Sequence, residues 1–403
     1  MSKMRELPTV HRLAYDGAID ADGHILEPPD MWERYLEPRF RHLALRIVRD
    51  SDGLEELEIG GRRSSVSTHG MPSLLGVMGA PDLMTIALDP ERTYVSEAAY
   101  GSMDPADRVH LLDAEGLDAA VLYPTLGLLW EAELDDPELS QAYTRAYNRW
   151  ICEFCADSSG RLIPVAHISL SDPDAAAQEL ERAVSEGARG CFVLPFTHAH
   201  QPLGHPDHDR VFAAAQDLDV VFAIHPGFEP DWAKGERFTG KSWTEDRLQL
   251  LESVRGGDGV RHQFATLFDL AVFDRFPRLK ILVLESGGGW VGHFMDRMDA
   301  VYGHTPIGVG MKLKDKPSSY FRERCWVSCD PDERSIAPLM QRYGATQFLW
   351  ASDYPHADHS PDYLQDLESL ARELPELDRK YFLGGNARAL FKIQAAQASA
   401  RLK

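Results

Sequence analysis

Short apolar runs recur along the chain, and from residue 104 onward they alternate with segments whose apolar residues repeat at helical spacing. Several runs are apolar throughout, which is typical of strands in a parallel sheet with both faces covered. Asp104 stands where a helix N-cap is expected for the segment Asp104–Gly116. The pattern predicts eight strands, which are Ala18–His24, Asp118–Tyr123, Leu162–Ile168, Arg189–Leu194, Asp219–Ile224, Lys280–Leu284, Cys325–Cys329 and Gln347–Ala351.

Eight strand–helix units in 403 residues predict a (β/α)8 TIM barrel. The alternative is an open doubly wound sheet, but no Gly-x-Gly-x-x-Gly opens a helix after the first strand. Residues 26–103 interrupt the alternation with an aromatic helical segment, a hairpin pattern over 45–67 and a Gly-, Pro- and Met-rich segment over 70–88. Because they follow the first strand, we predict one domain over 1–403, with 26–103 as a rim insertion that forms a lid. The segment 228–259, after the fifth strand, is a further lid candidate.

The charge, the apolar runs and the cysteine count of the chain limit the kinds of binding partner and cellular location that we expect. The chain has 63 acidic and 42 basic residues and a formal net charge of −21, which disfavours nucleic acids and anionic membranes and favours a small-molecule substrate. The segment 1–15 has no apolar core of a secretion signal, and no apolar run is long enough to cross a bilayer. Five cysteines, an odd number, favour a reducing compartment, so we expect a cytoplasmic protein. Cys152 and Cys155 form a Cys-x-x-Cys within a predicted helix, and we interpret them as packed thiols, not a redox pair.

Metal-binding types of side chain stand at the ends of several predicted strands. Asp22 and His24 lie two residues apart on the first strand, so they project to the same side. His225, Glu285 and Asp353 end or follow the fifth, sixth and eighth strands. In a parallel barrel these strand ends converge on one pocket, and imidazoles with carboxylates suit a divalent cation that also binds water. We therefore predict one metal ion held by Asp22, His24, His225 and Asp353, with Glu285 as a further ligand or a proton shuttle.

These positions resemble the amidohydrolase superfamily, in the branch typified by aminocarboxymuconate semialdehyde decarboxylase and the aromatic-acid decarboxylases. That branch begins with Ile-Asp-x-His-x-His, and Ile19–His24 match it with Asp22 in place of the first histidine. His225-Pro226 match its His-Pro, and Ala-Ser-Asp-Tyr-Pro at 351–355 matches its Gly-Thr-Asp-Tyr-Pro. Its closing Asn-Ala-x-x-Leu-Phe is matched by residues 386–391. The resemblance therefore spans nearly the whole chain outside the insertion.

The resemblance also shapes the expected metal chemistry. The superfamily's binuclear members bridge two ions with a carboxylated lysine on the fourth strand, and Arg189–Pro195 contain no lysine, so a single ion is implied. Zinc is the first expectation, with manganese or iron as alternatives because a carboxylate at Asp22 makes the site harder. The branch's acid/base histidine in His-Gly-Gly-Gly is replaced by Glu285 here. His356 and His359 are candidates to take over its role in proton transfer.

Two reactions fit this set, and we expect hydrolysis. Metal-activated water would attack a small cyclic or heteroaromatic substrate, Asp353 would accept a proton, and Glu285 or His356 would protonate the leaving group. The alternative is non-oxidative decarboxylation of an aromatic or unsaturated acid, which needs a positive group such as Arg62 or Arg63 to hold the carboxylate. Loss of the branch's strand-six histidine favours hydrolysis. A barrel that binds a ligand without chemistry is the third hypothesis, and an unchanged ligand affinity in Asp353→Asn without any turnover would favour it.

Three further side chains are candidate substrate contacts. His198, in Thr-His-Ala-His at 197–200, lies in a loop after the fourth strand and is either substrate-facing or solvated. Trp32 and Met78 belong to the apolar surface of the insertion, which either lines the pocket or packs on the barrel or a neighbouring subunit. We expect a homo-oligomer. Ser286–Gly289 resemble a phosphate-cradling loop, but tight packing between the sixth strand and its helix is the favoured interpretation.

Overall fold

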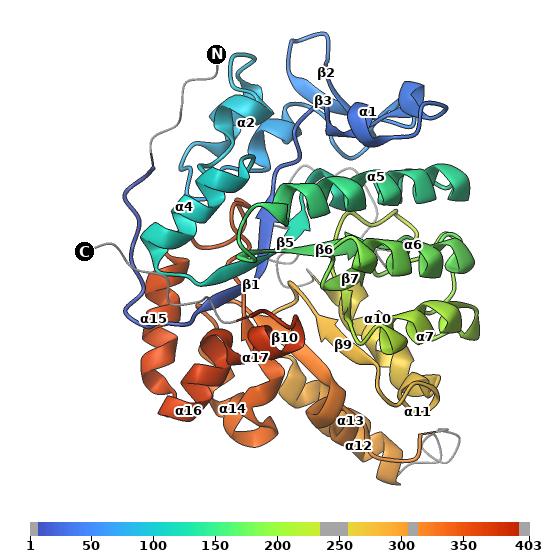
Figure 1. Cartoon of the computed structure of the whole chain (residues 1–403), viewed down its shortest axis with the longest axis vertical. Helices are drawn as coiled ribbons and strands as arrows, with labels where there is room; N and C mark the ends of the chain where they lie inside the picture. Colours follow the sequence, from blue (N-terminus) through green and yellow to red (C-terminus); the bar gives the residue numbers. More distant parts are fainter. Residues whose placement is uncertain (1–6, 234–256, 305–312, 395–403) are drawn as a thin grey trace, which may run out of the picture.

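The computed structural model describes residues 7–233, 257–304 and 313–394. Eight parallel strands form one sheet in the order β1-β5-β6-β7-β8-β9-β10-β11, and helices surround them (Figure 1). The predicted (β/α)8 barrel is confirmed. The strands are β1 (Ile19–Ile25), β5 (Ala119–Pro124), β6 (Leu162–His167), β7 (Gly190–Val193), β8 (Val221–Ile224), β9 (Lys280–Val283), β10 (Cys325–Cys329) and β11 (Phe348–Trp350).

The barrel closes between β1 and the segment that follows β11. The N–H of Asp353 donates to the carbonyl of Asp22 (3.0 Å), and the N–H of His24 donates to the carbonyl of Tyr354 (2.8 Å). Two residues before Asp22 on β1, the buried Asp20 carboxylate accepts hydrogen bonds from the N–H (3.0 Å) and the hydroxyl (2.6 Å) of Ser352. The backbone that closes the barrel therefore also carries three of the predicted metal ligands.

Three helices on the barrel wall begin with the same local signal. α4 (Pro105–Glu115), α5 (Pro137–Ala156) and α6 (Pro173–Ser185) each start with proline after an aspartate, and each aspartate side chain accepts from the next two free N–H groups. The predicted cap at Asp104 is confirmed. The other helices after β7 are α7 (Asp209–Asp217), α10 (Asp258–Asp269), α11 (Val272–Arg275), α12 (Val291–His304), α13 (Pro317–Arg324), α14 (Ile336–Tyr343), α15 (Tyr363–Glu373), α16 (Glu376–Lys380) and α17 (Asn386–Leu390).

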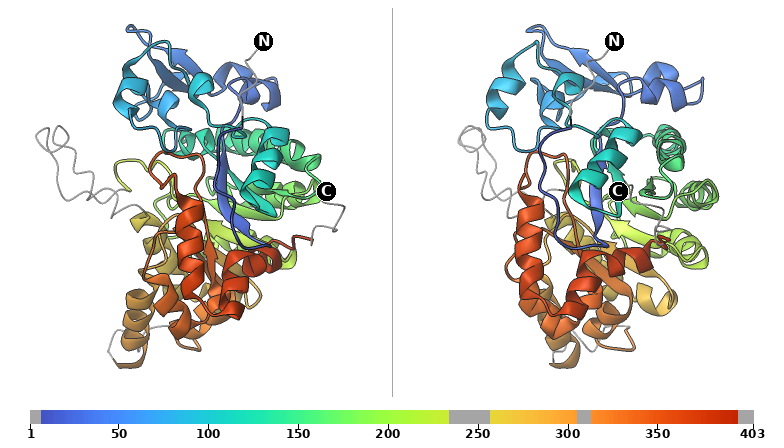
Figure 2. Two further views of the ribbon diagram at one scale, coloured as in Figure 1. Left: turned by 90° about the vertical axis from the view of Figure 1, so that its left-hand side faces the viewer. Right: turned by 60° about the vertical axis from the view of Figure 1, so that its left-hand side comes forward.

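The insertion after β1 forms a layer of its own at one end of the molecule (Figure 2). It contains α1 (Met31–Tyr35), the antiparallel sheet β2 (Arg46–Arg49), β3 (Glu55–Ile59) and β4 (Arg62–Arg63), then α2 (Leu83–Leu88) and α3 (Tyr94–Glu97), which confirms the hairpin predicted over 45–67. Its first part packs on α5, where the Tyr143 hydroxyl donates to the carbonyl of Leu43 (2.5 Å). Its role as a lid remains a prediction. Most of the second lid candidate, residues 234–256, lies outside the described residues.

None of the described helices is long and apolar enough to cross a membrane. The five cysteines are all buried and free, so Cys152 and Cys155 are packed thiols of α5, as predicted. Burial raises the pKa of the Cys152 thiol to about 11, which leaves it protonated and unreactive near neutrality. The cytoplasmic location and the homo-oligomer remain predictions.

Candidate metal centre and active site

The four predicted metal ligands come together at one end of the barrel. The register of β1 against β5 shifts between Asp20 and Gly23, and this irregularity lies at the segment that carries Asp22 and His24. Nε2 of His24 lies 3.6 Å from Oδ1 of Asp22 and 3.0 Å from Oδ1 of Asp353, and Nε2 of His225 lies 3.4 Å from Oδ1 of Asp22. All four side chains are buried.

The two imidazoles are oriented as ligands. Nδ1 of His24 donates to the carbonyl of Pro124 (2.7 Å) and Nδ1 of His225 to the carbonyl of Pro226 (2.6 Å), so each ring directs its Nε2 lone pair at the carboxylates. Both Nε2 atoms and both oxygens of Asp22 are buried without a hydrogen-bond partner in the described structure. Buried lone pairs facing carboxylates are costly unless a cation lies between them. This donor set therefore fits a divalent metal ion.

Asp353 is the most heavily contacted member of the cluster. Besides His24, its Oδ1 accepts from Nδ1 of His356 (3.0 Å), and its Oδ2 lies 2.6 Å from Nδ1 of His359. Nε2 of His356 hydrogen-bonds in turn to the hydroxyl of Thr125 (2.9 Å), a residue that no sequence motif identifies. Burial alone would raise the pKa of Asp353, but His356 and His359 outweigh it and hold that pKa well below its usual range. Asp353 is therefore ionised.

Glu285 lies beside His225, and its pKa is shifted in the opposite direction to that of Asp353. Its Oε2 is 3.4 Å from Nε2 of His225. Burial and the charge of Asp353 raise the pKa of Glu285 well above its usual range. Asp353 and Glu285 also share a left-handed backbone, with φ of 53° and 40°, a strain that proteins concentrate at functional sites. The site thus shifts the pKa values of its two neighbouring carboxyls in opposite directions.

A second polar cluster, which the sequence interpretation missed, lies beside the metal centre. Nε2 of His167, at the end of β6, donates to Oε2 of Glu131 (2.9 Å), and the Ser169 hydroxyl donates to Oε1 of the same carboxylate (2.6 Å). Glu131 belongs to a short 3-10 turn, Trp130–Ala132, after β5. His167 could have been identified from the sequence, because it is a histidine at the end of a predicted strand, as His225 is.

The three predicted substrate contacts lie in different places. His198 is partly buried at the second cluster, where its Nε2 donates to the carbonyl of Glu131 (2.8 Å). Met78 is partly buried, and its N–H donates to the carbonyl of Pro355 (3.0 Å), two residues beyond Asp353. Trp32 is fully buried with its ring 5.0 Å from that of Tyr143, so it belongs to the packing of α1 on α5. This position agrees with the alternative interpretation, in which Trp32 packs on the barrel, and a contact with substrate remains a prediction.

The arginines suggested as carboxylate anchors point elsewhere. Arg62 and Arg63 are exposed on β4. Arg62 donates to the carbonyl of Glu133 (3.2 Å), and Arg63 pairs with Glu56 across the small sheet. The expectation that either arginine reaches the pocket is not supported, because both side chains are exposed and each contacts another group, Arg62 the carbonyl of Glu133 and Arg63 the carboxylate of Glu56.

The glycine-rich loop after β9 is a packing element. The N–H groups of Gly288 and Gly289 donate to the carboxylate of Glu333 (2.8 and 2.9 Å), which occupies the amides that a phosphate would need. A Cβ on Gly288 would lie 2.5 Å from Sγ of Cys329, so the strand and helix meet too closely for a side chain. The favoured packing interpretation of Ser286–Gly289 agrees with this geometry.

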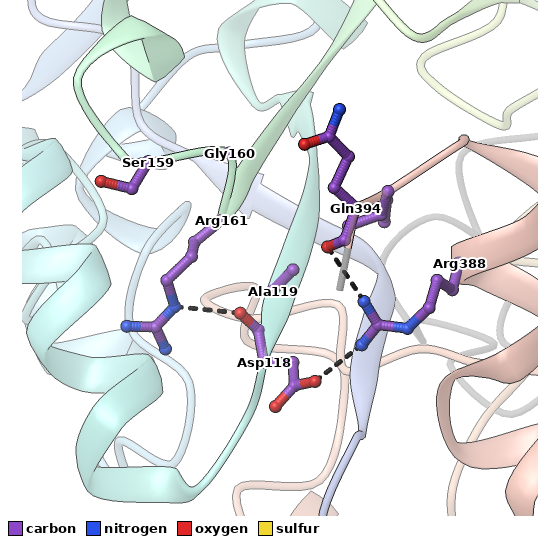
Figure 3. Close-up of a pocket in the computed structure, with 8 residues that line it drawn as sticks. Asp118, Ala119, Ser159, Gly160, Arg161, Arg388 and Gln394 are labelled. Atoms are coloured by element: carbon purple, nitrogen blue, oxygen red, sulfur yellow. Dashed lines mark hydrogen bonds and ion pairs between the residues drawn. The ribbon is translucent and has the colours of Figure 1, made fainter. Parts of the chain in front are cut away.

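A small hollow lies at the start of β5, at the end of the strand away from the metal centre, and its charged residues are paired with one another (Figure 3). Its arginines are already paired: Arg161 donates to the carbonyl of Asp118 (2.9 Å), and Arg388 contacts the Asp118 carboxylate (2.6 Å). Asp118 directly precedes β5, whereas Pro124, at the other end of that strand, contacts His24. The hollow therefore lies at the base of the barrel, away from the metal centre.

Comparison with known proteins places this geometry in a family. The sequence model described as Amidohydrolase matches residues 19–393, which include every residue of the metal centre. The chain belongs to the amidohydrolase family. This confirms the resemblance drawn from the motifs at Ile19–His24, His225-Pro226 and Asp353.

Named relatives of this amidohydrolase include decarboxylases. It is 26% identical over 314 residues to gamma-resorcylate decarboxylase of Rhizobium sp. (strain MTP-10005), covering 75% of this chain and 92% of the relative. It is 31% identical over 206 residues, 48% of this chain, to decarboxylase orsB of Emericella nidulans. An amidohydrolase structure from Mycobacterium avium subsp. paratuberculosis K-10 superposes with a TM-score of 0.76 at 22% identity, over 93% of this chain and 99% of that one. A 2,6-dihydroxybenzoate decarboxylase structure from Rhizobium superposes with a TM-score of 0.64 at 20% identity, over 94% of this chain and 99% of that one.

These relatives contradict the expectation of hydrolysis. That expectation rests on the loss of the branch's acid/base histidine on strand six and on the carboxylate-rich site. The structure weakens this argument, because Glu285 stands at the same strand end as the missing histidine, and burial together with the charge of Asp353 raises its pKa. A carboxylate-rich metal centre is therefore compatible with decarboxylation, and the hydrolase assignment is wrong.

Proposed function

We propose that this amidohydrolase is a divalent-metal-dependent, non-oxidative decarboxylase of aromatic hydroxycarboxylic acids. The observation that carries the proposal is the buried cluster in which Nε2 of His24 and Nε2 of His225 face the carboxylates of Asp22 and Asp353, with the Glu285 carboxyl 3.4 Å from His225. Decarboxylation needs both a cation for the acidic substrate and a proton donor for the vacated carbon. The decarboxylases among its relatives support the same reaction class.

We propose manganese as the ion, in place of the zinc first expected. Asp22, His24, His225 and Asp353 would hold it, a set with as many carboxylates as imidazoles, and carboxylates suit Mn²⁺. Their ligand atoms form two overlapping groups that share His24: Asp22, His24 and His225 in one, and His24, Asp353 and His356 in the other. A dihydroxybenzoic acid decarboxylase structure from Polaromonas sp. JS666 contains bound manganese with the inhibitor 2-nitroresorcinol. When bound, the cation supplies positive charge opposite the oxygens of an acidic substrate.

The protein's own residues account for the proton. The C–C bond to the carboxylate breaks, its electron pair remains on the ring carbon, and a C–H bond forms there as CO₂ leaves. Glu285 donates this proton from its carboxyl oxygen and recovers one from solvent after turnover. His356 and His359 keep Asp353 ionised, which stabilises positive charge in the centre throughout. Burial of the cluster limits access of water.

The proposal is tested by incubating manganese-loaded protein with a panel of aromatic acids that includes 2,6-dihydroxybenzoate and 5-carboxyvanillate. The expected result is release of CO₂ together with an equal amount of the decarboxylated phenol, and loss of both in Asp353→Asn. Absence of CO₂ from every acid, with a full complement of metal, would contradict it.

A further inference from the structure

We propose that His167 is a substrate-binding residue whose Nδ1 hydrogen-bonds a second hydroxyl group on the ring of the aromatic acid. The inference rests on the decarboxylase function proposed above and specifies its substrate as an acid with more than one ring hydroxyl. It is carried by the second polar cluster, which consists of Glu131, His167 and Ser169.

The cluster faces the same interior as the metal centre. The ring of His167 stacks on that of Phe192 with centroids 4.5 Å apart and an interplanar angle of 21°. The ring of Phe192 in turn lies 5.7 Å from that of His225. A single aromatic ring therefore separates His167 from a metal ligand. Trp130, 5.1 Å from His167, extends this wall, so a planar ring substrate would meet flat apolar surface beside the ion.

The hydrogen bonds of the cluster leave one atom of His167 available. Both carboxylate oxygens of Glu131 already accept, from Nε2 of His167 and from the hydroxyl of Ser169. This fixes the hydrogen on Nε2 and the orientation of the ring. The His167 side chain is fully buried, and within the described residues its Nδ1 has no hydrogen-bond partner. A polar atom in that state is costly unless something binds it.

A ring hydroxyl is the chemical group that fits this atom. With the hydrogen on Nε2, Nδ1 of His167 is an acceptor, and a ring hydroxyl supplies the O–H donor that it needs. A second carboxylate fits less well, because the anionic Glu131 lies on the other side of the same ring. Arg62 and Arg63 lie outside the pocket, so they do not compete for this role.

The test compares ligands that differ by one hydroxyl. For wild type, we expect kcat/KM for one of 2,3-, 2,4- or 2,6-dihydroxybenzoate to exceed that for 2-hydroxybenzoate by about 2- to 10-fold, the effect of one hydrogen bond. His167→Phe keeps an aromatic ring stacked on Phe192, and in this variant the ratio of the two kcat/KM values should fall to about one. Ser169→Ala is the matched control, since it removes a hydrogen bond to the same carboxylate but leaves Nδ1 in place, and it should keep the preference.

Binding provides a readout that does not depend on turnover. Calorimetry with 2-nitroresorcinol and 2-nitrophenol on manganese-loaded protein should show the same preference for the second hydroxyl, lost in the His167 variant. If His167→Phe is unstable because Glu131 is left unpaired, the double variant His167→Phe/Glu131→Gln removes that charge and is used instead.

The inference is overturned if wild type shows no preference for any second hydroxyl, or if the His167 variant keeps it. It is also overturned if Tyr123→Phe, which removes another buried hydroxyl beside His225, abolishes the preference while the His167 variant does not. These outcomes are separate from failure of the proposed function, in which wild type releases no CO₂ from any acid.

Discussion

Nδ1 of His359 lies 2.6 Å from Oδ2 of Asp353, the carboxylate oxygen opposite the one that His24 and His356 contact. His359 is also within 3.5 Å of Asp330, so it joins the loop after β11 to the end of β10. This arrangement lets one histidine set both the position and the charge of Asp353. His359 is a partner of a metal ligand and is not itself one of the four predicted ligands.

His359→Gln should lower activity about 10- to 100-fold, because partners of metal ligands typically contribute that much to affinity or turnover. The amide cannot carry a positive charge, so Asp353 loses electrostatic support. The measurement is kcat and manganese affinity of both proteins, with His42→Gln, a change at an exposed histidine of the insertion, as the control. Equal kinetics in His359→Gln and wild type would show that the contact has no functional role.

Glu285→Gln should lower kcat about 100-fold or more, while manganese content is unchanged. Glutamine keeps the size and hydrogen-bonding capacity of the side chain but has no proton to transfer. Turnover and metal analysis of the same preparation check this. Loss of manganese would instead identify Glu285 as a ligand, and unchanged kcat would exclude it as the proton donor.

Stability should decrease as the pH rises through neutrality, because several buried acids prefer the protonated form. Burial raises the pKa of Glu115 to about 7 from its ordinary value of 4.5, although the Tyr363 hydroxyl donates to it. The folded protein therefore binds more protons than the unfolded chain between these values. The contribution of Glu115 is complete below its unfolded pKa and is lost as the pH rises through about 7. Glu27, with a pKa raised by burial to about 7, acts in the same direction.

Glu115→Gln isolates this effect, since its carbonyl oxygen still accepts from Tyr363. We expect the fall in Tm between about pH 5 and about pH 8 to be smaller in the variant than in wild type. Thermal unfolding at several pH values measures it. Parallel Tm curves for the two proteins would show that Glu115 does not titrate in this range.

Met78→Lys should raise KM or abolish turnover without changing metal content. The N–H of Met78 donates a hydrogen bond to the carbonyl of Pro355, the residue before His356. A charged side chain at position 78 would therefore disturb an apolar wall of the substrate site. Steady-state kinetics and metal analysis check this. Unchanged kinetics would place the segment at a subunit interface or on the outer surface.

The sequence predicted the barrel and the metal centre because both depend on local patterns. Buried parallel strands appear as apolar runs, and an aspartate before proline begins α4, as it does α5 and α6. Asp22, His24, His225 and Asp353 were identifiable because strand ends in a barrel converge whatever their separation in sequence.

The remaining features depend on contacts that no local pattern encodes. Glu131 and His167 meet only because a 3-10 turn after β5 folds over the end of β6. Trp32 is buried because α1 packs on α5. The reaction was mispredicted for a different reason. Hydrolysis and decarboxylation use the same ligand set, and the protonation state of Glu285, which bears on that choice, depends on burial and on Asp353.

The most direct test of the account is the fate of the ring carbon that bears the carboxylate. Manganese-loaded protein is incubated with 2,6-dihydroxybenzoate in D₂O, and the products are analysed by mass spectrometry and NMR. Decarboxylation predicts CO₂ and a phenol with one deuterium at the vacated carbon, with both absent in Asp353→Asn. Recovery of the acid unchanged, or a product that contains oxygen from solvent without release of CO₂, would contradict it.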